Sequence, residues 1–143
     1  MLTGGEGFIA STLKDWVDVN GKEYKTLDIK SGGDVRNESI VKKAISKFKP
    51  DIIINLASTA GIDKVANDPI GCIETNIIGV KNILKHKGNI KLVHFSTSEV
   101  YGECANRNTE EDVLMVGAPN SPRWSYQVSK VCAEHLIVNS DRN

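Results

Sequence analysis

The chain has 143 residues, with 18 basic and 18 acidic side chains, so its formal net charge is zero. A chain of this length suits one domain that buries about two thirds of its unfolded surface. The two signs of charge are well mixed, without the basic stripe of a nucleic-acid-binding protein or the polar run of a disordered one. The longest apolar runs, such as Ile52–Ile54, are far too short to span a bilayer. We therefore expect neither a nucleic acid nor a membrane as a partner.

The cysteines indicate the cellular compartment. Cys72, Cys104 and Cys132 are scattered and lack CxxC spacing, which predicts a reducing, cytoplasmic setting. The chain begins with MLTGGEGF, which has neither the charged nor the apolar part of a signal peptide. The three histidines are scattered as well, and we expect no metal site.

The first half of the chain alternates between short apolar stretches and helical patterns. Met1–Thr3 is predicted to end a strand, and Phe8–Trp16 to form a helix that the turn Asn20–Gly21 closes. Tyr24–Ile29 is predicted as the second strand. Glu38–Phe48 has the apolar period of a helix.

The second half continues this alternation. Asp51–Ala57 is predicted as a third, fully apolar strand, and Asp68–Pro69 as the start of a long helix. Lys91–Phe95 is the fourth predicted strand. A polar loop over 102–122 and a helix over Ser125–Asn139 complete the pattern.

Strands that alternate with helices predict parallel βαβ units. The expected fold is therefore α/β: a Rossmann-type doubly wound parallel sheet with helices on both faces and about four strands in the order 3-2-1-4. A complete sheet of this type has six strands, and a usual strand is longer than the first one here. We therefore expect a truncated domain.

A glycine-rich loop, TGGEGFIA, follows the first predicted strand and opens a helix. In this context Gly4 permits the tight turn, and Gly7 lets the backbone approach a pyrophosphate at the start of the helix. Ala10 replaces the third glycine and is still small enough for close packing. The alternative is an ordinary glycine-rich turn.

Asp28 ends the second predicted strand, about 20 residues beyond the glycine loop. Its carboxylate can accept hydrogen bonds from the ribose hydroxyls of a dinucleotide and would repel a 2′-phosphate, which favours NAD over NADP. Lys30 and Arg36 nearby weaken this inference. The alternative is an aspartate that only ends a strand.

Hydroxyl and carboxyl side chains follow the fourth predicted strand, in HFSTSEVYG. Ligands of doubly wound sheets bind at the carboxyl ends of the strands, so Thr97, Ser98 and Glu99 are candidate site residues. A threonine at this place can also be an ordinary β-branched strand residue.

Tyr126 and Lys130 are four residues apart on the last predicted helix and so share one face. A free phenol has a pKa of about 10, and a nearby ammonium would stabilise the phenolate and make it a usable base. On its own this spacing is more often plain surface chemistry.

Seven stretches in this order resemble the extended short-chain dehydrogenase/reductase family, and within it the NAD-dependent nucleotide-sugar epimerases, dehydratases and decarboxylases. The resemblance covers Leu2 to about Val138. It rests on TGGEGFIA, LDI, GDVRN, NLAS, ETNIIGVKNIL, STSEVYGE and PRWSYQVSK.

The resemblance implies roles for individual residues. Thr97 would bind the reacting sugar oxygen, Tyr126 would remove its proton, and Lys130 would lower the pKa of the phenol and bind the nicotinamide ribose. Asn76 would help to hold this lysine. The residues implied in NAD binding are Gly4, Gly7, Phe8, Ile9, Asp28, Asp34, Val35, Leu56, Ala57, Ser58, Asn76, Tyr126 and Lys130.

Ser98 and Glu99 bear on the reaction. Dehydratases of the family carry an aspartic acid where this chain has Ser98, which counts against dehydration. The motif TSE with PRWSY is most similar to UDP-glucuronic acid decarboxylases, in which Ser98 or Glu99 could protonate an enolate after loss of CO₂. The motif also fits a C4 epimerase.

The resemblance places residues 1–143 as an NAD-binding domain without the substrate lobe, acting on a nucleotide sugar such as a UDP-sugar. It also implies a homodimer through helices near 70–86 and 125–139, with plain core burial of their apolar faces as the alternative. Two other readings remain open: a non-catalytic dinucleotide-binding module, and a remnant without function.

Overall fold

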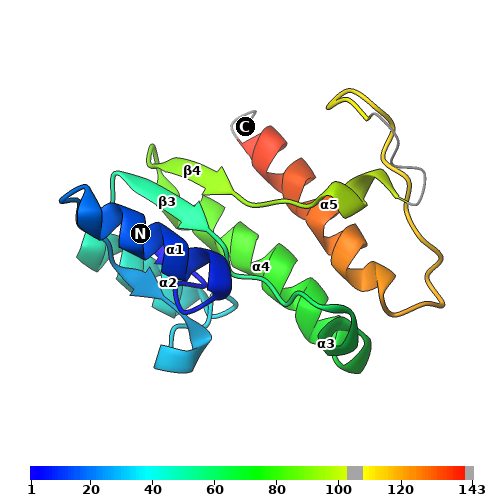
Figure 1. Ribbon diagram of the computed structural model, residues 1–143, viewed down its shortest axis with the longest axis horizontal. Helices are drawn as coiled ribbons and strands as arrows, with labels where there is room; N and C mark the ends of the chain where they lie inside the picture. The colour runs from blue at the N-terminus through cyan, green and yellow to red at the C-terminus, as the bar shows by residue number, and fades with distance from the viewer. Residues whose placement is uncertain (103–107, 141–143) are drawn as a thin grey trace. The chain divides into compact units, whose positions relative to one another are not determined.

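The computed structural model describes residues 1–102 and 108–140, so Cys104 lies outside the described residues (Figure 1). The chain divides into two compact units. The first consists of Met1–Ser58 and Ile78–Phe95, and the second of Thr59–Ile77 and Ser96–Asn143. The helix α4 (Pro69–Lys87) contributes residues to both units.

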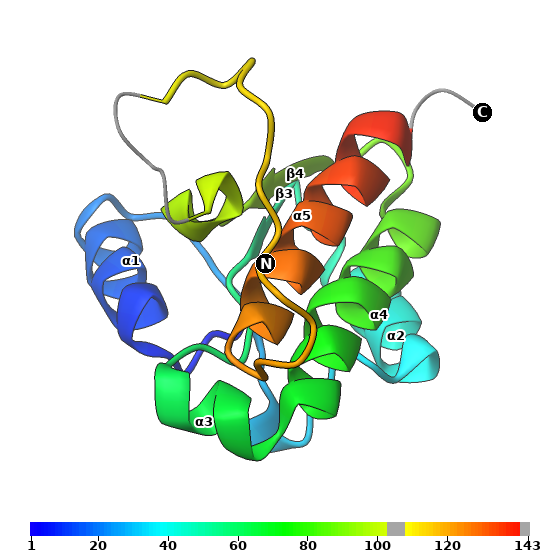
Figure 2. The ribbon, with the colours of Figure 1, turned by 90° about the vertical axis from the view of Figure 1, so that its right-hand side faces the viewer.

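The first unit is built on a parallel sheet. Its four strands are β1 (Leu2–Thr3), β2 (Thr26–Leu27), β3 (Ile52–Asn55) and β4 (Lys91–His94). Helix α1 (Phe8–Val19) lies on one face of the sheet and α2 (Glu38–Phe48) on the opposite face (Figure 2). The α/β class, the parallel sheet and the two layers of helices are confirmed.

The predicted strand order 3-2-1-4 is wrong, because the sheet has the order β2-β1-β3-β4. Leu2 of β1 lies between Thr26 of β2 and Ile54 of β3, so β1 rather than β2 pairs with the third strand. The physical reason lies in strand pairing. β3 pairs with β1 along one edge and with β4 along the other, whereas the two-residue β2 pairs only with β1.

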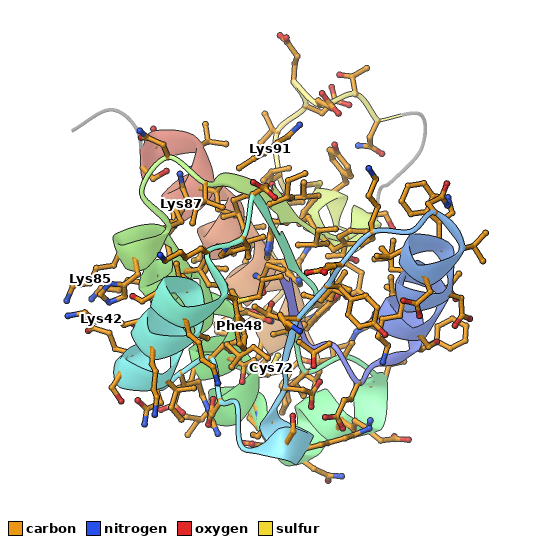
Figure 3. The ribbon with its side chains drawn as sticks, turned by 90° about the vertical axis from the view of Figure 1, so that its left-hand side faces the viewer. Lys42, Phe48, Cys72, Lys85, Lys87 and Lys91 are labelled. Atoms are coloured by element: carbon orange, nitrogen blue, oxygen red, sulfur yellow. The ribbon has the colours of Figure 1, made fainter. Side chains whose placement is uncertain are left out.

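Side chains from the sheet and from α2 form the core of the first unit. Asn37 is the N-cap of α2, because its side-chain oxygen accepts hydrogen bonds from the backbone N–H groups of Ser39 and Ile40. In Figure 3, Lys42 and Lys85 point outward, while Phe48 packs against the core. The buried core residues are Met1, Leu27, Val35, Val41, Ala44, Ile45, Ile53 and Ile83.

The second unit is helical. It contains α3 (Ile62–Asn67), the first half of α4, the 3-10 turn η2 (Ser98–Tyr101) and α5 (Trp124–Asn139). The sequence predicted α5 to within one residue but missed α3, which is only six residues long and has no side-chain cap. No helix among the described residues is long and apolar enough to cross a membrane.

Most predicted strands were too long. The second one, expected over 24–29, contains only Thr26–Leu27, because the chain turns at once into the 3-10 turn η1 (Ile29–Ser31). The side chain of Asp28 starts this turn by accepting a hydrogen bond from the N–H of Lys30.

Two neighbouring isoleucines of β3 test the position of the core. Ile53 is fully buried, whereas Ile52 is 43% exposed on the other face of the strand. We expect Ile53→Ala to lower the free energy of unfolding by about 2–5 kcal/mol, since it removes apolar contacts and leaves a cavity. Ile52→Ala is the matched control and should lower it much less in urea denaturation. Equal losses would contradict the proposed burial of this strand.

Candidate functional site

The glycine loop of the first unit is shaped by close backbone contacts. Gly4 has a φ of +66°, and a Cβ at this position would lie 2.7 Å from the backbone N of Ala57. Only glycine fits here, as the sequence predicted. The loop leads to Gly7, the N-cap of α1, which provides no side-chain cap. The first N–H groups of α1 are thus suited to an anion.

Phe8 and Ile9, the first two residues of α1, are 89% and 47% exposed. Exposed apolar side chains at a helix start that also offers free N–H groups can line a ligand. Both were predicted to contact a cofactor, and this remains a prediction.

Asp28 has a second role that the sequence did not reveal. Its Oδ1 accepts the N–H of Lys30 and its Oδ2 accepts the N–H of Glu6, both at 2.9 Å. The carboxylate therefore ties the end of β2 to the glycine loop, and it is 7% exposed. A carboxylate offers about four lone-pair sites, so two remain for ligand hydroxyls.

Asp34 and Val35 are neighbours in the chain, but only Val35 has its side chain in the core. Asp34 forms an ion pair with Arg36 at 2.7 Å, and the hydrogen bonds from Arg36 lower the pKa of its carboxyl group. The side chain of Val35 is buried in the core, so only its backbone remains for a ligand. Asn82, which sequence reasoning missed, donates hydrogen bonds to the carbonyls of Val35 and Arg36 and holds this segment.

Leu56, Ala57 and Ser58 follow β3 at the carboxyl end of the sheet. The N–H of Leu56 donates to the carbonyl of Thr3. The hydroxyl oxygen of Ser58 is buried and has no hydrogen-bond partner among the described residues. A buried polar atom without a partner is costly, so this position fits a ligand that supplies the missing hydrogen bond.

A buried polar chain crosses the ends of three strands in this unit. The hydroxyl of Thr3 donates to Oδ1 of Asn55, and Nδ2 of Asn55 lies 2.9 Å from Nδ1 of His94. The signal in the sequence was a polar residue at the end of each apolar strand.

The structure brings together Tyr126 and Lys130 of the second unit. Nζ of Lys130 lies 5.8 Å from the centre of the Tyr126 ring, on the same face of α5 as predicted. Tyr126 is half-buried, and Lys130 is 3% exposed. Burial lowers the pKa of Lys130 to about 8, while the charges of Cys72 and Glu134 oppose this shift.

Asn76 is linked to the catalytic candidates through Ser129. Its Nδ2 donates to the hydroxyl of Ser129 at 2.8 Å, and this hydroxyl donates to the carbonyl of Tyr126, also at 2.8 Å. Oδ1 of Asn76 is buried without a partner among the described residues. Ser129 was not predicted as a site residue, although it directly precedes Lys130.

Thr97, Ser98 and Glu99 form the start of η2. The hydroxyl of Thr97 accepts the N–H of Glu99 at 3.3 Å, so Thr97 caps this turn. The side chains of Ser98 and Glu99 are exposed. Their acidic or hydroxyl groups are thus accessible to a ligand.

In the parts of the chain that the structure describes, no three His, Cys, Asp or Glu residues could hold a metal ion.

The buried ammonium of Lys130 leads to a prediction about stability. Because its pKa is lowered in the folded chain, the unfolded chain binds the proton more tightly between about pH 8 and 10.5. The buried ammonium therefore lowers the free energy of unfolding most below about pH 8. This destabilisation becomes smaller as the pH rises from about 8 to 10.5. We expect Lys130→Met to raise the Tm at pH 7 and to lose this advantage toward pH 10.5.

The exposed Lys81 of α4 supplies the control. Lys81→Met should change the Tm little at either pH in calorimetry. A Tm of Lys130→Met that is lower than that of the wild type at pH 7 would show that the ammonium is stabilised rather than strained.

Comparisons with known proteins extend these observations. A curated relative from Bacillus cytotoxicus, UDP-N-acetyl-alpha-D-glucosaminuronate decarboxylase, is 31% identical over 96% of this chain and 48% of its own length. dTDP-glucose 4,6-dehydratase of Salmonella typhimurium is 25% identical with the same coverage. The chain thus spans about half the length of the curated relatives it matches.

Solved structures agree with the fold. The structure of UDP-glucose 4-epimerase from Thermus thermophilus, a complex with NAD, matches with a TM-score of 0.76 and 29% identity. The match covers 99% of this chain and 50% of the epimerase. The sequence profile of the NAD dependent epimerase/dehydratase family matches residues 1–143. The chain therefore belongs to this family, the extended short-chain dehydrogenase/reductase group that its motifs predicted, whose members depend on NAD.

Proposed function

We propose that the protein modifies a nucleotide sugar by transient oxidation at C4, and that it decarboxylates a nucleotide-linked hexuronate in this way. The observation that carries the proposal is the pairing of Tyr126 with the buried Lys130 on one face of α5. An ammonium beside a phenol stabilises the phenolate, and burial strengthens this effect. A binding module without chemistry would need neither residue.

The first unit has the features that NAD requires. The N-terminus of α1 has no side-chain cap and suits the diphosphate, and Asp28 keeps lone pairs for ribose hydroxyls. The buried hydroxyl of Ser58 has no hydrogen-bond partner among the described residues. A bound cofactor could supply this partner. When bound, NAD would accept the hydride from C4 of the sugar and return it later.

The residues of the second unit would manage protons. The phenolate of Tyr126 would take the proton of the C4 hydroxyl while the C4–H bond breaks, which leaves a ketone. Thr97 would hold the same oxygen by a hydrogen bond. A C4 ketone makes a C6 carboxylate a β-keto acid, which loses CO₂ and leaves an enolate. Ser98 or Glu99 would protonate this enolate.

Two observations favour decarboxylation over dehydration. Dehydration needs an acid next to the departing C6 hydroxyl, and the hydroxyl of Ser98 is a far weaker acid than a carboxyl group. The relative from Bacillus cytotoxicus acts, by its name, on a UDP-linked uronate. We propose a UDP-sugar as the substrate and the cytoplasm as the place of action.

Epimerisation at C4 is the second candidate. It needs no acid beyond Tyr126, and the solved epimerase from Thermus thermophilus is 29% identical to this chain. The two reactions differ in their products, because only decarboxylation releases CO₂. A UDP-hexose and a UDP-hexuronate offered in parallel therefore separate them.

We also propose that the protein forms a homodimer through helices near 70–86 and 125–139. Ile70 on α4 and Val138 on α5 are 70% and 67% exposed, so each helix leaves a large apolar side chain uncovered in the single chain. A second copy would cover these side chains in a four-helix bundle.

Replacing the phenol tests the assigned base. Tyr126→Phe removes the hydroxyl but keeps the ring, so we expect the rate of CO₂ release from a UDP-hexuronate to fall about 10²–10⁴-fold. The affinity for NAD, followed by fluorescence titration, should change little. Tyr24→Phe, at a half-buried tyrosine before β2, is the matched control and should keep the wild-type rate. An unchanged rate for Tyr126→Phe would remove this residue from its role.

Sedimentation velocity tests the homodimer. We expect the wild type to sediment as a dimer and Val138→Asp to sediment as a monomer, because a buried carboxylate at the interface would be unpaired. Val113→Asp places the same charge on another exposed valine outside both helices and should leave the dimer intact. A monomeric wild type would favour plain core burial of these helices.

A further inference from the structure

Gln127 is a fully buried amide on α5, directly after Tyr126 and three residues before Lys130. None of its surface is accessible. Burial of an amide without hydrogen bonds costs several kcal/mol in an apolar medium, so its partners explain why it is there. None of the sequence motifs assigns it a role.

The amide of Gln127 uses each of its polar atoms on backbone groups. Nε2 donates to the carbonyl of Glu99 at 2.7 Å and to the carbonyl of Met115 at 2.6 Å. Oε1 accepts the N–H of Gly117 at 2.9 Å. One side chain thus fastens two separate segments, η2 and 115–117, to α5, and η2 lies beside this helix (Figure 1).

The two segments are also packed tightly against their neighbours. A Cβ at Gly102, which has a φ of +76°, would lie 2.8 Å from Cβ of Met115. A Cβ at Gly117 would lie 2.1 Å from the ring of Trp124. Neither position has room for a side chain, so close packing holds the two segments together and holds 115–117 against Trp124 of α5, in addition to the hydrogen bonds of Gln127.

Both backbone polar groups of Glu99 are hydrogen-bonded. Its N–H donates to the hydroxyl of Thr97, and its carbonyl accepts from Gln127. The hydrogen bonds of Glu99 therefore connect the amide of Gln127 to Thr97 and Glu99, the two residues proposed to act on the sugar. Gln127 also directly follows Tyr126 in the chain.

We propose that Gln127 is a positioning residue for the reaction: its buried amide sets where Thr97 and Glu99 stand relative to Tyr126. The inference rests on the proposed function. Gln127 itself touches no reacting atom and acts through the backbone of Glu99 and of residues 115–117.

An acid of the same shape makes the sharpest test. Ionised glutamate has no donor and would place negative oxygens against the carbonyls of Glu99 and Met115. Protonated glutamate regains one donor and keeps an acceptor for Gly117. We therefore expect Gln127→Glu to lower kcat at least tenfold at pH 8 and to approach the wild-type value as the pH falls. The affinity for NAD should stay unchanged.

Two further variants separate charge from shape. Gln127→Met keeps the volume but has no polar hydrogen-bonding group, so its loss of kcat should not depend on pH. Asn139→Asp is the matched control. The exposed amide of Asn139 on α5 also donates a hydrogen bond to a carbonyl, that of His135. Removing this donor should leave kcat unchanged. The elements that Gln127 touches carry other titratable groups, which occur in all variants, so each rate is compared with the wild type at the same pH. These groups are Glu99 and Tyr101 on η2, and Tyr126, Lys130, Cys132, Glu134 and His135 on α5.

Hydrogen–deuterium exchange without substrate gives a readout that does not depend on turnover. We expect Gln127→Glu at pH 8 to speed exchange in peptides that cover 97–102 and 115–118, while the rest of α5 stays protected. Unchanged exchange in both segments would overturn the proposal. Faster exchange along all of α5 would also overturn it, since Gln127 would then only stabilise the unit.

The two readouts distinguish the possible failures. Faster local exchange together with a normal kcat would show that Gln127 holds the segments but does not position the reaction, which overturns the proposal. A wild type that turns over neither a UDP-hexuronate nor a UDP-hexose would overturn the proposed function. Gln127 would then retain only the fastening role that the exchange data show.

Discussion

The first unit depends on one close approach, that of Gly4 to the backbone after β3. A side chain at this position would collide with Leu56 and Ala57, so the chain can turn from β1 into the glycine loop only where no Cβ is present. The N–H of Gly4 donates to the carbonyl of Leu27 at the end of β2. This single residue therefore brings the ends of three strands together, and with them the loop, Asp28 and Ser58.

Helix α5 has the corresponding role in the second unit. It carries Tyr126 and Lys130 on one face and buries Gln127 and Ser129 as hydrogen-bonding residues. Its neighbours are thus held by polar groups rather than by apolar packing alone. Such contacts are directional, and they fix positions more narrowly than apolar contacts do. Burial of the Lys130 ammonium opposes folding, which is typical of a residue retained for its chemistry.

Polar atoms without partners lie among well-paired ones. The side chains of Thr3, Asn55 and Asp28 are buried and hydrogen-bonded, whereas the hydroxyl of Ser58 and Oδ1 of Asn76 find no partner among the described residues. Most buried polar atoms in folded proteins are paired. Ser58 and Asn76 were both assigned to cofactor binding from the sequence, and a bound ligand could complete their hydrogen bonding.

The sequence by itself determined the α/β class, the bounds of α2, the glycine loop and the shared face of Tyr126 and Lys130. These features follow from local rules: apolar periodicity, the conformational freedom of glycine, and the i, i+4 geometry of a helix. Only the tertiary structure decided the strand order, the double duty of Asp28, the burial of Val35 and the partners of Gln127. Each of these depends on contacts between segments far apart in the chain, and local patterns carry no information about which segments meet.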